Sequence, residues 1–277
     1  MQLNKTLLIA TAGATLAAAA PALASEGGDV GVRIVNGQID TISIEEGGTD
    51  FSGPTQRVFV ADFGEFEDGD EAIFSPPPPG LSDTDSFVTN LPGFDTLPDT
   101  FTPGVNVGLD VNLDSTFFGS NVVEYDPATD TVGSTSVDVQ ISFGSALSRT
   151  DGSFGTDPLS LPTFSGGGGE FDSGRWHRHY VYAVYDGLDT STGDLIPPAN
   201  GVYILEAVLS TEDAGIADSD SIFLVFGVGA SESDVEAAED FLLATIPEPA
   251  SLALLGVGVY YAIAHAHSVT ADRELQS

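Results

Sequence analysis

The sequence lacks cysteine entirely and contains a single lysine among its 277 residues. Without cysteine the chain can form no disulfide, thiolate metal site or cysteine nucleophile, so its packed core must hold it together. The scarcity of basic residues leaves 42 acidic side chains against seven basic ones and a net charge of −35. A field of this sign repels nucleic acid and anionic lipid surfaces, so we expect neither as a partner.

The sequence also lacks any long stretch with helical periodicity before residue 231, and its body is typical of β-structure. The clearest hairpin joins 32–35 to 38–44 through Asn36-Gly37, a pair that readily adopts the positive φ angles of a tight turn. Further runs rich in Val, Ile, Phe and Tyr predict strands at 57–63, 105–113, 136–143, 176–185, 202–209 and 222–226. We therefore predict an all-β domain, an antiparallel β-sandwich or jelly-roll.

Three segments differ from this pattern. Residues 231–245 begin with Ser and acidic residues and predict one short helix, capped by Ser231 or Ser233. Two long connections, 64–102 and 145–174, are rich in Pro, Gly and Asp, and we expect them to be irregular.

The first residues have the composition of an export signal. Lys5 supplies a short positive region, and residues 6–20 are almost entirely apolar or small. The Ala-Leu-Ala that ends at Ala24 fits a signal-peptidase pattern, with cleavage expected between Ala24 and Ser25. The sequence therefore predicts a signal peptide at 1–24 and export through the general secretion machinery.

A second short pattern lies near the end of the chain. Pro247-Glu248-Pro249 is followed by an almost wholly apolar run at 250–264 and then by His265-Ala266-His267. The prolines disfavour helix through the motif, and the run is short against the roughly 20 residues of a full bilayer crossing. These residues resemble the PEP-CTERM sorting signal, although that family has a cluster of arginines after its apolar helix and this tail has only Arg273.

The resemblance implies that an exosortase in the envelope of a Gram-negative bacterium processes the protein. It also implies transient anchoring in the inner membrane through the apolar helix at 250–264, followed by a location in the cell envelope or outside the cell. On this interpretation the chain divides into a signal peptide at 1–24, a β-sandwich domain at 25–246 and a sorting signal at 247–277.

The body is similar to a set of exported PEP-CTERM proteins of planctomycetes and related bacteria. The stretches that carry this similarity are 29–41, 57–63, 92–95 with Phe101 and 103–104, 176–180, 201–206 and 223–226. The similarity implies a shared fold and no particular activity. A related cyanobacterial group is thought to respond to zinc, which is a reason to consider metal binding.

The body has its densest group of potentially metal-binding or catalytic side chains at Trp176-His177-Arg178-His179-Tyr180. On a strand, alternate residues share a face, so His177 and His179 should point the same way. Two imidazoles at this spacing form half of a zinc or copper site, which carboxylates would complete, and Asp29 is a candidate for the third ligand. The alternative is a pair of histidines on a polar strand face, held by hydrogen bonds or solvent.

A second candidate site is a calcium site in an acidic segment. Its residues are Asp62, Glu65, Glu67, Asp68, Asp70 and Glu71. Calcium takes several oxygen ligands, but the regular spacing of a calcium-binding loop is missing, and the composition favours a solvated acidic loop over a calcium site.

Three functions remain open on the sequence. The first is a non-enzymatic, acidic protein of the cell envelope or extracellular matrix that interacts with divalent cations or polysaccharide. The second is a surface or periplasmic zinc-binding protein that uses His177 and His179. The third is an extracellular hydrolase, for which the chain offers no Gly-x-Ser-x-Gly motif.

Overall fold

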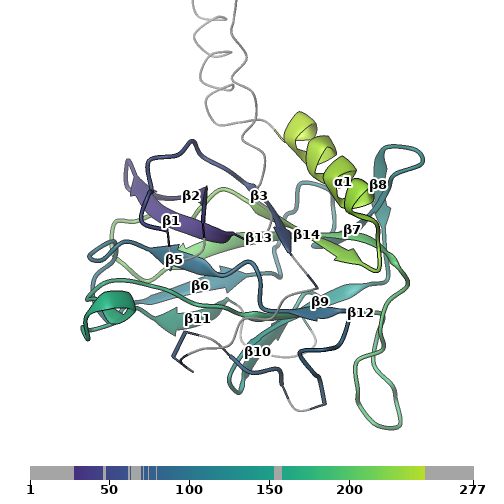
Figure 1. Ribbon diagram of the computed structural model, residues 1–277, viewed down its shortest axis with the longest axis horizontal. Coiled ribbons are helices and arrows are strands. Elements are labelled where there is room, and N and C mark those ends of the chain that lie inside the picture. Colours follow the sequence, from purple (N-terminus) through teal and green to yellow (C-terminus); the bar gives the residue numbers. More distant parts are fainter. Residues whose placement is uncertain are drawn as a thin grey trace, which may run out of the picture.

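The computed structural model describes residues 28–246, apart from 46–47, 62, 64–69, 71, 74, 79 and 153–157. Strands dominate this part of the chain, and α1 (Glu232–Thr245) is its one α-helix (Figure 1). The all-β prediction is therefore confirmed. The strands are β1 (Asp29–Val35), β2 (Gln38–Ile44), β3 (Val58–Ala61), β4 (Val88–Thr89), β5 (Phe94–Thr96), β6 (Asn106–Asp110), β7 (Val122–Asp126), β8 (Thr131–Ser134), β9 (Asp138–Phe143), β10 (Ala146–Arg149), β11 (Leu159–Pro162), β12 (Val181–Tyr185), β13 (Gly201–Thr211) and β14 (Ile222–Val228).

The predicted hairpin forms as expected. β1 and β2 pair antiparallel, with Val35 opposite Gln38 across a two-residue turn. Asn36 and Gly37 have φ angles of 54° and 81°, the positive values that this turn requires and that Asn and Gly tolerate best. The turn chemistry therefore fixes the register of the N-terminal strand.

The largest sheet has the order β11-β6-β13-β14-β3, and β7 adds to β13 while β8 adds to β7. Along β14 the side chains alternate between two cores, with Leu224 in the larger core and Phe223 and Val225 in the smaller one. A strand buried on both faces needs a cover on each side, and α1 covers the smaller core with Ala238 and Leu242.

The helix begins where the sequence predicts. The side chain of Ser231 accepts a hydrogen bond from the backbone N–H of Asp234, which satisfies one of the amides that the first turn leaves without a helical partner. Glu232 and Asp234 lie in the first turn, where negative charge interacts favourably with the helix dipole.

Two smaller sheets pack against the larger core and position the candidate site. One has the order β2-β1-β5, and the other has the order β10-β9-β12-β4. Most strand pairs are antiparallel, but β1 pairs with β5 and β14 with β3 in parallel. The parallel β1–β5 pair brings the start of the described chain against a segment more than sixty residues later in the sequence.

Several sequence-based expectations need correction. The strand predicted at 176–185 is shorter, because β12 begins only at Val181. The connection 64–102 contains β4 and β5, and the connection 145–174 contains β10, β11 and a short 3₁₀ helix, so neither is wholly irregular. These strands are only two to four residues long, too short for a local pattern to predict them, and pairing with other segments determines their conformation.

Both predicted targeting segments lie outside the described residues, including the cleavage site at Ala24–Ser25, the Pro247-Glu248-Pro249 motif and the apolar run at 250–264. Over the described part of the chain, the structure has no helix that is long and apolar enough to cross a membrane.

Candidate metal centre

Strands β1 and β5 and the segment that precedes β12 bring one aspartate and two histidines together. Asp29 is the first residue of β1, and β1 lies beside β5. Phe94 of β5 in turn exchanges two backbone hydrogen bonds of 2.9 Å with Arg178. Because His177 and His179 flank Arg178, this exchange holds both histidines next to the start of β1.

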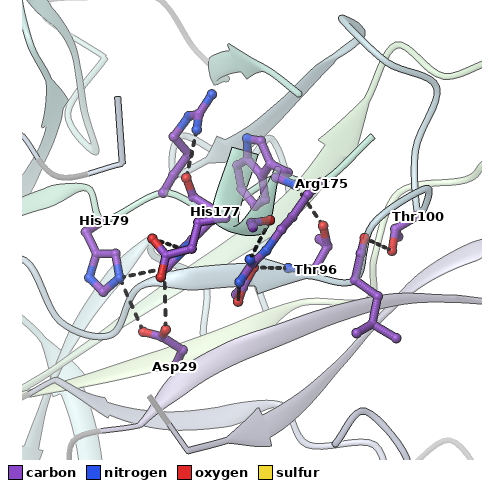
Figure 2. A network of polar contacts seen from close by, with 12 residues as sticks. Asp29, Thr96, Thr100, Arg175, His177 and His179 are labelled. Atoms are coloured by element: carbon purple, nitrogen blue, oxygen red, sulfur yellow. Dashed lines mark hydrogen bonds and ion pairs between the residues drawn. The ribbon is translucent and has the colours of Figure 1, made fainter. Parts of the chain in front are cut away.

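The imidazoles converge on the Asp29 carboxylate (Figure 2). The Nε2 atoms of His177 and His179 lie 3.1 Å apart. Oδ2 of Asp29 lies 3.8 Å from Nε2 of His177, and its Oδ1 lies 3.6 Å from Nε2 of His179. Each residue offers one ligand atom within 4.8 Å of the other two, and among the residues that the structure describes no other group of three His, Asp or Glu side chains does so.

These separations fit a small cation. Ligand atoms at tetrahedral zinc distances lie about 3.3–3.6 Å from one another. The observed distances of 3.1–3.8 Å bracket that range. The donor set of two neutral nitrogens and one carboxylate oxygen is one that zinc accepts.

The outer nitrogen of His179 has a hydrogen-bond acceptor, whereas that of His177 has an oxygen only at a longer distance. Nδ1 of His179 lies 3.3 Å from the carbonyl oxygen of Asn90, and Nδ1 of His177 lies 4.0 Å from Oε2 of Glu170. A carbonyl oxygen only accepts, so the His179 ring donates from Nδ1 and directs the lone pair of Nε2 toward the centre. Metal-binding histidines typically have such an outer acceptor, because it fixes the tautomer in which Nε2 is the ligand.

The three side chains are nearly inaccessible to solvent, with exposed fractions of 5% for His177 and 1% for both His179 and Asp29. Burial lowers the pKa of His177 to about 4, assisted by Arg175 and Arg178. Burial also lowers the pKa of His179 to about 3, with His177 contributing. Both rings are therefore neutral at pH 7, the state in which imidazole binds a metal. Burial argues against solvent as the partner of these rings, whereas the hydrogen bonds between the two Nε2 atoms and from His179 to Asn90 are those of the alternative, a hydrogen-bonded pair.

Gly93 leaves the space that the His179 ring occupies. A Cβ atom at this position would lie 2.4 Å from Cε1 and Nε2 of His179, so any larger residue must displace the ring. The backbone N–H of Gly93 also donates to Oδ1 of Asp29 at 3.1 Å. In the sequence, the segment 92–95 stands out only as part of a resemblance, and no local pattern assigns it to the site.

We expect Gly93→Ala to destabilise the protein by about 2 kcal/mol, since overpacking of a well-packed interior typically costs 1–3 kcal/mol. The same clash should shift the ligand nitrogen of His179 and weaken metal binding. Chemical denaturation and metal titration measure the two effects. Gly133→Ala is the control, because Gly133 has open space where its Cβ would be. Equal results for the two variants would contradict this role of Gly93.

A buried ion pair holds the histidine segment in place. Arg175 donates from Nε to Oδ1 of Asp95 at 2.8 Å and from Nη2 to Oδ2. The residue after Arg175 is fixed as well, because the backbone N–H of Trp176 donates to Oγ1 of Thr96 at 2.8 Å. β5 therefore anchors this segment through side chains at Asp95 and Thr96 as well as through its backbone.

Arg178 points away from the centre. Its guanidinium lies 4.3 Å from the ring centroid of Phe164 and donates to the carbonyl oxygens of His177 and Pro162. The cation therefore braces the backbone between the two histidines, and stacking on an aromatic ring suits a buried guanidinium.

The acidic segment predicted for calcium falls largely outside the described part of the chain. Asp70 is described and is exposed, and the other five residues lie outside. Of the sequence-predicted site residues, the structure brings together His177, His179 and Asp29. It adds Gly93 and Asn90, whose roles depend on contacts that no local pattern reveals.

The chain matches no family model, and no curated protein or solved structure is significantly similar to it. The geometry of this centre and the chemistry of the sequence are therefore the grounds for a function.

Proposed function

We propose that this protein is an exported, non-enzymatic zinc-binding protein whose centre consists of Asp29, His177 and His179. The observation that carries the proposal is the convergence of three buried ligand atoms, two of them imidazole nitrogens, with the outer nitrogen of His179 bonded to a carbonyl oxygen. Imidazole favours zinc over calcium and magnesium, which prefer sets of oxygen ligands.

The burial of the ligands supports a structural role for the metal. A structural zinc usually has four protein ligands, and a catalytic zinc has three with one position open to water or substrate. Asp29, His177 and His179 supply three, so a structural role depends on substrate being unable to reach the fourth position. The side chains of this centre are 1–5% exposed, so a polymeric substrate has no direct path to the metal. Such burial favours a binding protein over the hydrolase that the sequence left open.

We also propose that the protein is exported and sorted to the cell envelope or extracellular matrix. The support comes from the sequence of 1–24 and 247–277, which implies signal peptidase and an exosortase as processing partners and 250–264 as a transient inner-membrane anchor. The net charge of −35 is consistent with an extracellular role among divalent cations or polysaccharide.

Within the body, we propose sandwich-like packing of the sheets. Buried side chains from all three sheets belong to one hydrophobic cluster, represented by Val30 in β1, Ile141 in β9 and Leu205 in β13. Opposed sheet faces that share one core are the defining feature of a sandwich.

Calorimetric titration of the metal-stripped, full-length chain with zinc chloride tests the proposal. We expect one zinc ion per chain at the centre and a dissociation constant at least about 100-fold weaker for His177→Gln/His179→Gln, because the double variant retains only one of three ligands. Calcium chloride should not compete for this site.

The tail supplies a matched control, because His265 and His267 have the same spacing as the buried pair. The variant His265→Gln/His267→Gln should leave the high-affinity binding unchanged. If zinc produces no heat with the unaltered chain, or if removing His177 and His179 changes nothing, the proposal is wrong.

A further inference from the structure

We infer that zinc at this centre acts as a clasp, a metal cross-link that fastens strand β1 to the body of the protein as a disulfide could in a chain with cysteine. This inference rests on the proposed zinc site and adds what the metal does there. It is independent of export and sorting.

The ligands come from two different sheets. Asp29 opens β1 in the β2-β1-β5 sheet, whereas His177 and His179 lead into β12 of the β10-β9-β12-β4 sheet. The two sheets share no strand, and the backbone bonds between Phe94 and Arg178 link them beside the centre. A metal held by Asp29 and the histidines would add a strong bond across this junction.

The position of Asp29 in the chain makes this bond useful. The first residues of a strand fray unless a contact ties them down. Asp29 is the first residue of β1, and the backbone N–H of the next residue, Val30, donates to the carbonyl oxygen of Gly93 at 2.8 Å. Fixing the Asp29 carboxylate would therefore hold the first hydrogen bonds of the strand closed.

The chain has no other covalent means to do this. It contains no cysteine, so no disulfide can join distant segments. A metal that links Asp29 to His177 and His179 closes a very long loop, and cross-links across long loops restrict the unfolded chain most in the loop-entropy model.

Amide hydrogen exchange of the full-length chain, with and without zinc chloride, tests the clasp. At a free zinc concentration 100 times the dissociation constant, opening that breaks the site should become about 100-fold rarer. We expect exchange in β1, including the Val30 amide, to slow by about that factor. Exchange in α1 should change little, because the helix packs on the smaller core away from the centre.

Asp29→Asn separates the clasp from the fold of β1. The amide keeps an oxygen that can accept from the N–H of Gly93, but it removes the charged ligand. In this variant, zinc should slow exchange of β1 by less than about 10-fold. His265→Gln/His267→Gln is the control and should retain the full response.

Three outcomes would contradict the clasp alone or both the clasp and the zinc site. If calorimetry shows zinc bound through His177 and His179 while β1 exchange does not slow, the clasp is wrong and the zinc site stands. The clasp is also wrong if zinc slows β1 and α1 equally, because the site would then open only on global unfolding. If zinc does not bind, both proposals fail.

Discussion

Acidification of the metal-free protein from pH 7 to pH 4.5 should lower its free energy of unfolding by up to about 5 kcal/mol through His177 and His179. Burial places the pKa values of these residues at about 4 and about 3 in the folded protein, against 6.5 for an ordinary histidine. Below pH 6.5 the unfolded chain therefore binds protons that the folded chain excludes. The stability is fully present above that pH and is lost as the pH falls toward 4.

The measurement is urea unfolding at a series of pH values in the presence of a metal chelator. The carboxylates of this acidic chain also titrate below pH 5, so the histidine contribution is obtained by comparison with His177→Gln/His179→Gln. This variant keeps every acidic group but has no buried imidazole at the centre. Parallel pH profiles for the two proteins would contradict the prediction. Zinc should move the loss of stability to lower pH, because protons must displace the metal before they reach the ring nitrogens.

The hairpin and the helix were predictable because their signals are local. Asn36-Gly37 specifies a tight turn by its φ angles alone, and Ser231 with its acidic neighbours specifies a helix start. The short strands β4 and β5 carry no such signal. Their conformation depends on pairing with β12 and β1, segments that lie far away in the sequence.

The candidate centre was predictable only in the part that has a local sequence signal. The spacing of His177 and His179 is visible in the sequence. Their side chains point to the same place as predicted, although both residues precede β12 and do not lie within it. Asp29 could be named as a ligand but not positioned, because the parallel β1–β5 pair brings it to the histidines. Gly93 gave no signal of its own, since its role is to leave room for a ring 86 residues further along the chain.

Loss of the Arg175 side chain should have a large effect on stability. Arg175→Ala leaves the Asp95 carboxylate, whose side chain is 0% exposed, without its cation, and breaking a buried pair in this way typically costs about 3–5 kcal/mol. Burial raises the pKa of Asp95 while Arg175 opposes that rise, so the ionised carboxylate depends on its partner. Zinc affinity should fall as well, because Arg175 anchors the segment that presents His177.

Urea unfolding at pH 7 measures the cost, and Arg33→Ala is the matched control. Arg33 pairs with Asp40 at 2.8 Å, but both side chains are about one-fifth exposed, and an ion pair in contact with solvent contributes about 1 kcal/mol or less. Both arginines also donate to backbone carbonyl oxygens, Arg33 to those of Phe51 and Gly53 and Arg175 to that of Gly169. Restoring neutrality with Arg175→Met/Asp95→Leu should recover much of the stability, since apolar groups of similar size often replace a buried pair at little cost. If Arg175→Ala costs no more than Arg33→Ala, then the backbone bonds between Phe94 and Arg178 suffice to hold the histidine segment, and the ion pair does not position the centre.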